Sequence, residues 1–85
     1  MSGRRTTPGL RDHRYAQLMA ILTARRQELC LSQRELADRI GIHRQFVSRV
    51  ELGERRLDVA EFVDFARALE LDPGQLIDEM PERSP

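Results

Sequence analysis

The chain is poor in the residues that build disulfides and metal sites. It has no lysine, no tryptophan, one cysteine and two histidines among 85 residues. Cys30 therefore has no partner for an internal disulfide, and His13 and His43 give it no zinc-ligand spacing. We expect no metal site and no cofactor, and we predict that Cys30 is a small, buried apolar side chain.

Long apolar runs and catalytic motifs are also missing. No stretch approaches the roughly 18 consecutive apolar residues of a membrane span, and the basic start MSGRRTTPG lacks the apolar run of a secretory signal. We expect one small cytoplasmic domain with no membrane partner. The sequence has no glycine-rich phosphate loop and no nucleophile elbow. Glu35, Asp38 and His43 could suggest a hydrolase, but Glu35 is explained by helix capping, so we expect no enzyme and no catalytic residue.

The basic residues are all arginine, and they are distributed unevenly along the chain. Residues 1–56 hold twelve arginines and six acids, whereas residues 57–85 hold two arginines and eight acids. A basic half of this kind can face a polyanion, while an acidic third can face solvent or a protein. Arginine also suits bidentate contacts with phosphate and guanine.

The apolar periodicity predicts an all-α fold of five short helices. We expect residues 1–11 to form a disordered basic arm, residues 12–80 the domain and residues 81–85 a C-terminal tail. In the arm, Arg4 and Arg5 could enter a minor groove or remain solvated. The first helix, about 12–29, has Asp12 as its N-cap. Its apolar stripe consists of Tyr15, Leu18, Ile21, Leu22 and Leu29.

Residues 32–53 predict two helices joined by a tight turn. Ser32 and Glu35 form a capping box that begins the first helix, and Gly41 can take the left-handed conformation that ends it. The second helix, about 43–52, has Val47 and Val50 as its buried stripe. Two helices this short need neighbours to be stable.

Two further helices follow the 32–53 motif. Asp58 and Glu61 predict a second capping box, and this helix should cover the core with Val59, Phe62, Ala66 and Leu69. Asp72, Pro73 and Gln75 predict the N-cap, the first-turn proline and the capping partner of a last helix that runs to about Met80.

These residues together resemble the lambda-repressor-like, Cro-type helix-turn-helix regulators, also called the xenobiotic-response-element (XRE) type. The resemblance covers roughly residues 15–78 and includes Leu31-Ser32-Gln33, Glu35-Leu36-Ala37, Gly41-Ile42, the run from Val47 to Glu51, Gly53, the run from Phe65 to Leu69, and Leu76. It implies a five-helix domain whose helix after the turn enters the major groove of DNA, usually as a symmetric dimer. The chain departs from this family at three positions. Many members have glycine where this chain has Cys30, serine or threonine where it has His43, and proline where it has Leu57.

The helical wheel and the resemblance together suggest which residues would contact DNA. Gln45, Ser48 and Arg49 point away from Val47 and Val50, and Arg44 flanks this outward face at its N-terminal end. The candidate base contacts are Arg44, Gln45 and Arg49, with Ser48 in a secondary role. Phe46 lies between the two faces and should pack against the turn, or else contact a sugar or thymine methyl. The candidate phosphate contacts are Gln33, Arg34, Arg55 and Arg56; replacing Arg55 should then weaken binding to all sequences alike. The resemblance further implies that Glu51 pairs with Arg26.

The function that follows is a DNA-binding transcriptional regulator, most simply a repressor. Leu76, Ile77 and Met80 predict a homodimer that matches a palindromic operator with half-sites roughly 10 bp apart. Alternatively, Leu76 and Ile77 fold back onto the core, with Met80 on a frayed end. A rival function is the antitoxin of a toxin–antitoxin pair, in which the acidic C-terminal third binds a partner protein.

Overall fold

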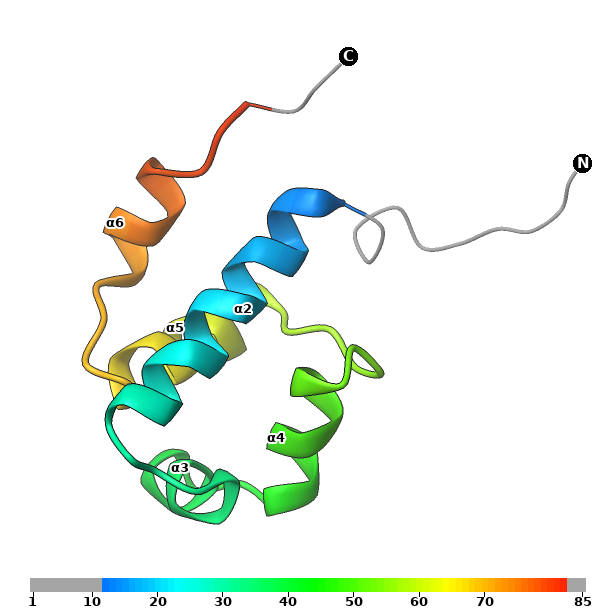
Figure 1. The fold of residues 1–85 in the computed structure, drawn as a ribbon, viewed down its shortest axis with the longest axis vertical. Helices are drawn as coiled ribbons and strands as arrows, with labels where there is room; N and C mark the ends of the chain where they lie inside the picture. The colour runs from blue at the N-terminus through cyan, green and yellow to red at the C-terminus, as the bar shows by residue number, and fades with distance from the viewer. Residues whose placement is uncertain (1–11, 83–85) are drawn as a thin grey trace, which may run out of the picture.

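The structure is a computed structural model that describes residues 12–82, and it contains five helices and no strand in this range (Figure 1). The predicted all-α fold is confirmed. The predicted arm, residues 1–11, and residues 83–85 of the predicted tail lie outside the described residues. The helices are α2 (His13–Glu28), α3 (Gln33–Ile40), α4 (Arg44–Glu51), α5 (Val59–Ala68) and α6 (Pro73–Asp78).

The contacts between the helices place the helix-turn-helix pair in the domain. α3 packs against α4 and α5, α2 packs against α4, and α6 packs against α5. The pair α3 and α4 therefore lies at one end of the domain, and α6 lies at the other (Figure 1). No helix within residues 12–82 has the length and apolar character needed to cross a membrane.

The predicted capping boxes are present at two helix starts. The Ser32 hydroxyl accepts from the Glu35 N–H at 3.0 Å, and the Glu35 carboxylate accepts from the Ser32 N–H at 2.8 Å. Asp58 and Glu61 make the same reciprocal bonds at 2.8 and 3.0 Å. These bonds satisfy backbone donors that have no partner within the helix, so they fix where α3 and α5 begin.

The last helix differs from its prediction. Asp72 accepts from the N–H groups of Gly74 and Gln75, as an N-cap should. The Gln75 side-chain amide, however, donates to Glu79 at 3.1 Å, so Gln75 is a capping partner through its backbone N–H and forms no reciprocal capping box with Asp72. Glu79 lies four residues along the helix and is within easy reach of that amide. α6 ends at Asp78, before Met80.

Cys30 corrects another prediction, because it is exposed rather than buried. Its backbone has a φ of 58°, and its N–H donates to the Gln27 carbonyl while the Leu31 N–H donates to the Arg26 carbonyl. This is a left-handed helix end of the kind that glycine favours. The chain reversal turns the thiol outward and leaves Leu29 and Leu31 to pack against the core.

One core joins four of the helices and the loop before α5. Its buried members are Leu18, Leu22, Leu36, Ala37, Val47, Val50, Leu57, Phe62, Phe65, Ala66 and Leu69. Two residues predicted to face this core do not. Ile21 is largely exposed and lies at the edge of α2 that faces α6, and Val59 is 81% exposed because it begins α5 at the rim of a surface groove.

Candidate nucleic-acid interface

The turn between α3 and α4 is fixed by backbone hydrogen bonds. The N–H groups of Gly41 and Ile42 both donate to the Ala37 carbonyl, at 2.8 and 3.0 Å. Gly41 has a φ of 86°, which a residue with a side chain rarely adopts. His43 is the N-cap of α4 but makes no side-chain cap bond. The angle between the two helices therefore depends on Gly41 and on buried contacts, and little on the cap.

α4 has a buried side and an exposed side. Val47 and Val50 are buried, as their spacing predicts. Arg44, Gln45 and Arg49 are exposed, and Ser48 is half-buried. The outward face of α4 thus consists of polar side chains that can donate hydrogen bonds, of the types that read base edges in a major groove.

The arginines fall into two groups according to their partners. Side chains of the first group form ion pairs with acids: Arg14, Arg25, Arg26, Arg39 and Arg55. Within residues 12–82, the side chains of Arg34, Arg44 and Arg49 form no hydrogen bond or ion pair with any described residue. Their charges are therefore available to an external anion. All three belong to the helix-turn-helix pair, and two arginines outside it, Arg56 and Arg67, likewise make no side-chain hydrogen bond or ion pair with a described residue.

Two of these free arginines share one surface hollow. Arg34 of α3 and Arg44 of α4 line a hollow of about 340 Å³, together with Asp38, Ile42, His43 and Gln45. The structure thus brings together one predicted phosphate contact and two predicted base contacts on a single face. The carboxylate of Asp38 is the one acid in this lining.

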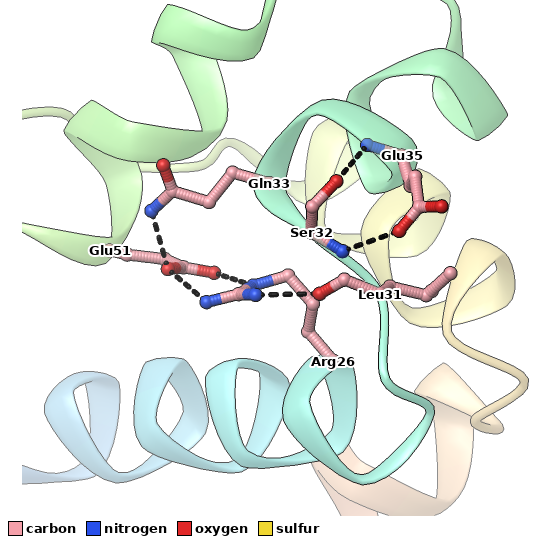
Figure 2. A network of polar contacts seen from close by, with 6 residues as sticks. All are labelled: Arg26, Leu31, Ser32, Gln33, Glu35 and Glu51. Atoms are coloured by element: carbon pink, nitrogen blue, oxygen red, sulfur yellow. Dashed lines mark hydrogen bonds and ion pairs between the residues drawn. The ribbon is translucent and has the colours of Figure 1, made fainter.

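At the C-terminal end of α4, Glu51 joins three parts of the chain (Figure 2). Its carboxylate accepts from Arg26 Nε at 2.7 Å and Arg26 Nη2 at 3.0 Å, and from Gln33 Nε2 at 2.9 Å. Arg26 Nη1 also donates to the Leu31 carbonyl at 2.7 Å. Both charged side chains are only 13% exposed. The predicted pairing of Arg26 with Glu51 is present, and it ties α2 to the C-terminal end of α4.

Gln33 has a second role that the sequence did not reveal. It was predicted as a phosphate contact, and it lies at the first position of α3, where backbone N–H groups favour an anion. One amide hydrogen is directed at Glu51, as Figure 2 shows, and the other is left for a further acceptor. Glu51 therefore orients Gln33 as well as Arg26.

Arg55 and Arg56 follow α4, and both pack on aromatic rings. The Arg55 guanidinium makes two hydrogen bonds to the Glu61 carboxylate, each 3.0 Å long, and lies 4.1 Å from the centre of the Phe46 ring. Arg56 lies 5.8 Å from the centre of the Tyr15 ring. Phe46 in turn contacts Phe65 of the core, with ring centres 6.0 Å apart, so it packs on α5, a contact that its position in the sequence did not indicate.

The Arg55–Glu61 pair changes the titration of both groups. Hydrogen bonds from Arg55, and then from the Asp58 backbone, hold the pKa of Glu61 below its ordinary value, and Glu61 raises the pKa of Arg55. Because the Glu61 pKa is lowered on folding, its pairing stabilises the fold above the ordinary glutamate pKa, and this contribution is lost as the pH falls through the lowered value.

Two arginines that sequence reasoning did not single out bind the C-terminal end of α5. Arg25 Nε donates to the Leu69 carbonyl at 3.1 Å, and Arg39 Nη1 donates to the Ala68 carbonyl at 3.0 Å. Both also pair with Glu70. Cations are favourable beside the free carbonyls of a helix end. The contacts join residues 29 or more positions apart, so no local pattern marks them.

Comparisons with known proteins agree with this geometry. The model of the HTH_3 family, described as helix-turn-helix, matches residues 22–76. The structure resembles an XRE-family like protein from Pseudomonas syringae pv. tomato str. DC3000, with 43% sequence identity, a TM-score of 0.74, and coverage of 79% of this chain and 82% of that one. It also resembles a hypothetical transcription factor, NHTF, from Neisseria, with 28% identity, a TM-score of 0.68, and coverage of 88% and 85%. None of the curated proteins compared with the chain matches it.

Proposed function

The chain belongs to the XRE-type helix-turn-helix family of DNA-binding transcriptional regulators, and on this premise we propose that it is a repressor that reads a palindromic operator as a dimer. In this proposal α4 lies in the major groove, and Arg44, Gln45 and Arg49 contact base edges, with Ser48 in a secondary role. The observation that carries the proposal is that Arg44 and Arg49 lie on the exposed side of α4 with side chains that pair with no residue within 12–82, whereas five other arginines are paired with acids.

Phosphate contacts on either side of α4 would fix its position on the duplex. Arg34 lines the same hollow as Arg44, and Gln33 is held at the N-terminal end of α3 by Glu51. Arg56 extends from the loop after α4, and it can reach an anion while its guanidinium stays near Tyr15. Contacts of this type add affinity without sequence information and release counterions.

A selection from random duplexes tests the proposal directly. We expect enrichment of one short inverted repeat, bound with a Kd on the order of 10 nM at physiological salt and more weakly as salt rises. An equimolar shuffled duplex is the control for charge-driven binding. Recovery of no enriched site would contradict the proposal that the chain recognises a specific operator.

The proposed dimer surface centres on Ile77. Leu76 and Met80, which were predicted with it, are half-buried against the core, whereas Ile77 is 50% exposed. Ile77 and the exposed Val59 line one groove of about 430 Å³. The apolar walls of the groove come from Tyr15, Leu18, Met19, Leu57, Phe62 and Val63. A second copy is the proposed occupant because one domain of this size would bury too little DNA surface for tight specific binding.

Ile77→Glu should therefore break the dimer and weaken operator binding on the order of 100-fold, because the two half-sites would no longer be bound as a unit. Sedimentation velocity with labelled operator measures the stoichiometry. Ala60→Glu adds the same charge at an exposed position of α5 and should leave two copies on the duplex. A wild-type protein that remains a single copy on its selected operator would contradict the dimer.

A second candidate function rests on the acids that flank the same groove. Asp58, the N-cap of α5, and Asp78 of α6 line it, and Asp64 of α5 and Glu79, which follows α6, are exposed. An apolar groove with an acidic rim fits a basic segment of a partner protein, as in an antitoxin that binds its toxin. A toxin-like reading frame beside this one, whose purified product displaces the dimer, would favour this alternative.

A further inference from the structure

We infer that Arg55 is a positioning residue for α4 and not a phosphate contact. This inference rests on the proposed function, because it concerns how α4 is held for reading DNA. It assigns to Arg55, Glu61 and Phe46, here called the Arg55 cluster, a role that the arginine-rich loop sequence does not suggest. Three independent observations carry it.

The first observation is that the end of the Arg55 guanidinium formed by Nη1 and Nη2 is already bound within the chain. Both terminal nitrogens donate to the Glu61 carboxylate, and one of them also donates to the Arg56 carbonyl. One face of the group lies on the Phe46 ring. One of the two edges through which a guanidinium can grip a phosphate bidentately, the Nη1 and Nη2 edge, is thus bound to a carboxylate of the same chain.

The second observation is the position of Phe46. It is the third residue of α4, between the proposed base contacts Gln45 and Arg49. Its ring contacts both Phe65 and the Arg55 guanidinium. Glu61 and Phe65 are four residues apart on α5, so they lie on the same side of that helix. α5 therefore holds Phe46 twice, directly through Phe65 and indirectly through Glu61 and Arg55.

The third observation is that the backbone of Arg55 is bound to α4 itself. The N–H groups of Glu54 and Arg55 both donate to the Arg49 carbonyl, at 2.8 and 3.3 Å. The next turn of the loop is fixed by the Leu57 N–H, which donates to Tyr15 Oη at 3.1 Å. A change in the Arg55 cluster would consequently move the residues beside it that face the DNA.

The Glu61→Gln variant distinguishes a phosphate contact from a positioning residue, because the two roles predict opposite changes in affinity for the operator. Glutamine can keep the capping bond with Asp58, so α5 should still begin at Val59. If Arg55 were a phosphate contact, loss of the carboxylate would free it and tighten binding to every duplex. If Arg55 positions α4, we expect binding to the selected operator to weaken about tenfold for each half-site, as when one base contact is lost there, with binding to a shuffled duplex unchanged or slightly tighter.

Arg55→Lys and Arg55→Ala give a second, independent comparison. Lysine keeps the charge but has no planar fork, so it should fail to restore operator affinity if the residue positions α4. A phosphate contact would be largely restored by lysine, and Arg55→Ala would lower the slope of log K against log salt by about 0.9 for each copy bound to the operator. We expect that slope to stay unchanged. This comparison holds even if Glu61→Gln folds poorly.

The matched control is Glu54→Gln, which removes a charge from the same loop. The Glu54 side chain is exposed and pairs with no residue in the 12–82 range, so the variant should tighten binding to all duplexes slightly. Tighter operator binding by Glu61→Gln, or full rescue by Arg55→Lys, would overturn the inference.

A measurement without DNA keeps this inference distinct from the proposed function. In NMR spectra of the free protein, Glu61→Gln should shift the Phe46 ring signals and the amides of α4, while Glu54→Gln should not. If the wild type selects no operator, the proposed function fails, and unchanged α4 signals in Glu61→Gln would then overturn the positioning role as well.

Discussion

Glu51→Ala is expected to lower the free energy of unfolding by roughly 3–5 kcal/mol, which is a large share of the total for a domain of this size. Arg26 and Glu51 are each only 13% exposed, and the carboxylate is the acceptor for two Arg26 nitrogens. Without it, the guanidinium keeps only the Leu31 carbonyl as an acceptor in a poorly solvated position. The Gln33 amide loses its acceptor in the same step.

Urea denaturation followed by circular dichroism measures this loss. Glu51→Gln keeps the shape and the acceptor oxygen but not the charge, so its loss should be smaller than that of Glu51→Ala. Glu54→Ala, three residues along at an exposed position, is the matched control and should stay within about 0.5 kcal/mol of wild type. A double-mutant cycle with Arg26→Met should show strong coupling. An unchanged melting temperature in Glu51→Ala would count against this account.

Local patterns predicted the helix ends because each end is decided by a few neighbouring residues. The boxes formed by Ser32 with Glu35 and by Asp58 with Glu61 need only a hydroxyl or carboxylate and a glutamate three positions on. Gly41 was predictable for the same reason, since its left-handed backbone depends on the residue itself. The helical spacing of Val47 and Val50 among polar residues likewise predicted the buried and exposed sides of α4 from the sequence alone.

Predictions failed where the outcome depends on what lies across space. Val59 has the spacing of a core residue, but no described element covers the first turn of α5. Cys30 is apolar enough to be buried, yet the chain reverses there and turns it outward. Arg25 and Arg39 look like the unpaired Arg44 and Arg49 in the sequence, and only the folded chain brings carbonyl groups at the end of α5 to them. A contact between groups that are far apart in the sequence leaves no local pattern, so it cannot be predicted from one sequence.

Replacing the proposed base contacts should alter which DNA is bound, as well as how tightly. In a repeated selection, Gln45→Ala should recover the same operator with the preference lost at one position of each half-site, and Arg49→Ala at a different position. Each lost bidentate contact costs about 1–3 kcal/mol, or roughly 5- to 150-fold in affinity. A dimer loses the contact in both half-sites, so the combined effect on operator binding should approach the square of that factor.

The control for charge is Arg67→Ala, because Arg67 is exposed on α5 and its side chain pairs with no residue between 12 and 82. It removes the same charge as Arg49→Ala from outside the helix-turn-helix pair, and it should leave the selected sequence unchanged. Affinity lost equally for operator and shuffled duplex in Arg49→Ala would mean that Arg49 contacts phosphate. Loss confined to the operator, with a changed selected sequence, requires that Arg49 reaches a base edge, because phosphate contacts carry no sequence information. That difference decides whether the exposed side of α4 reads DNA or only holds it.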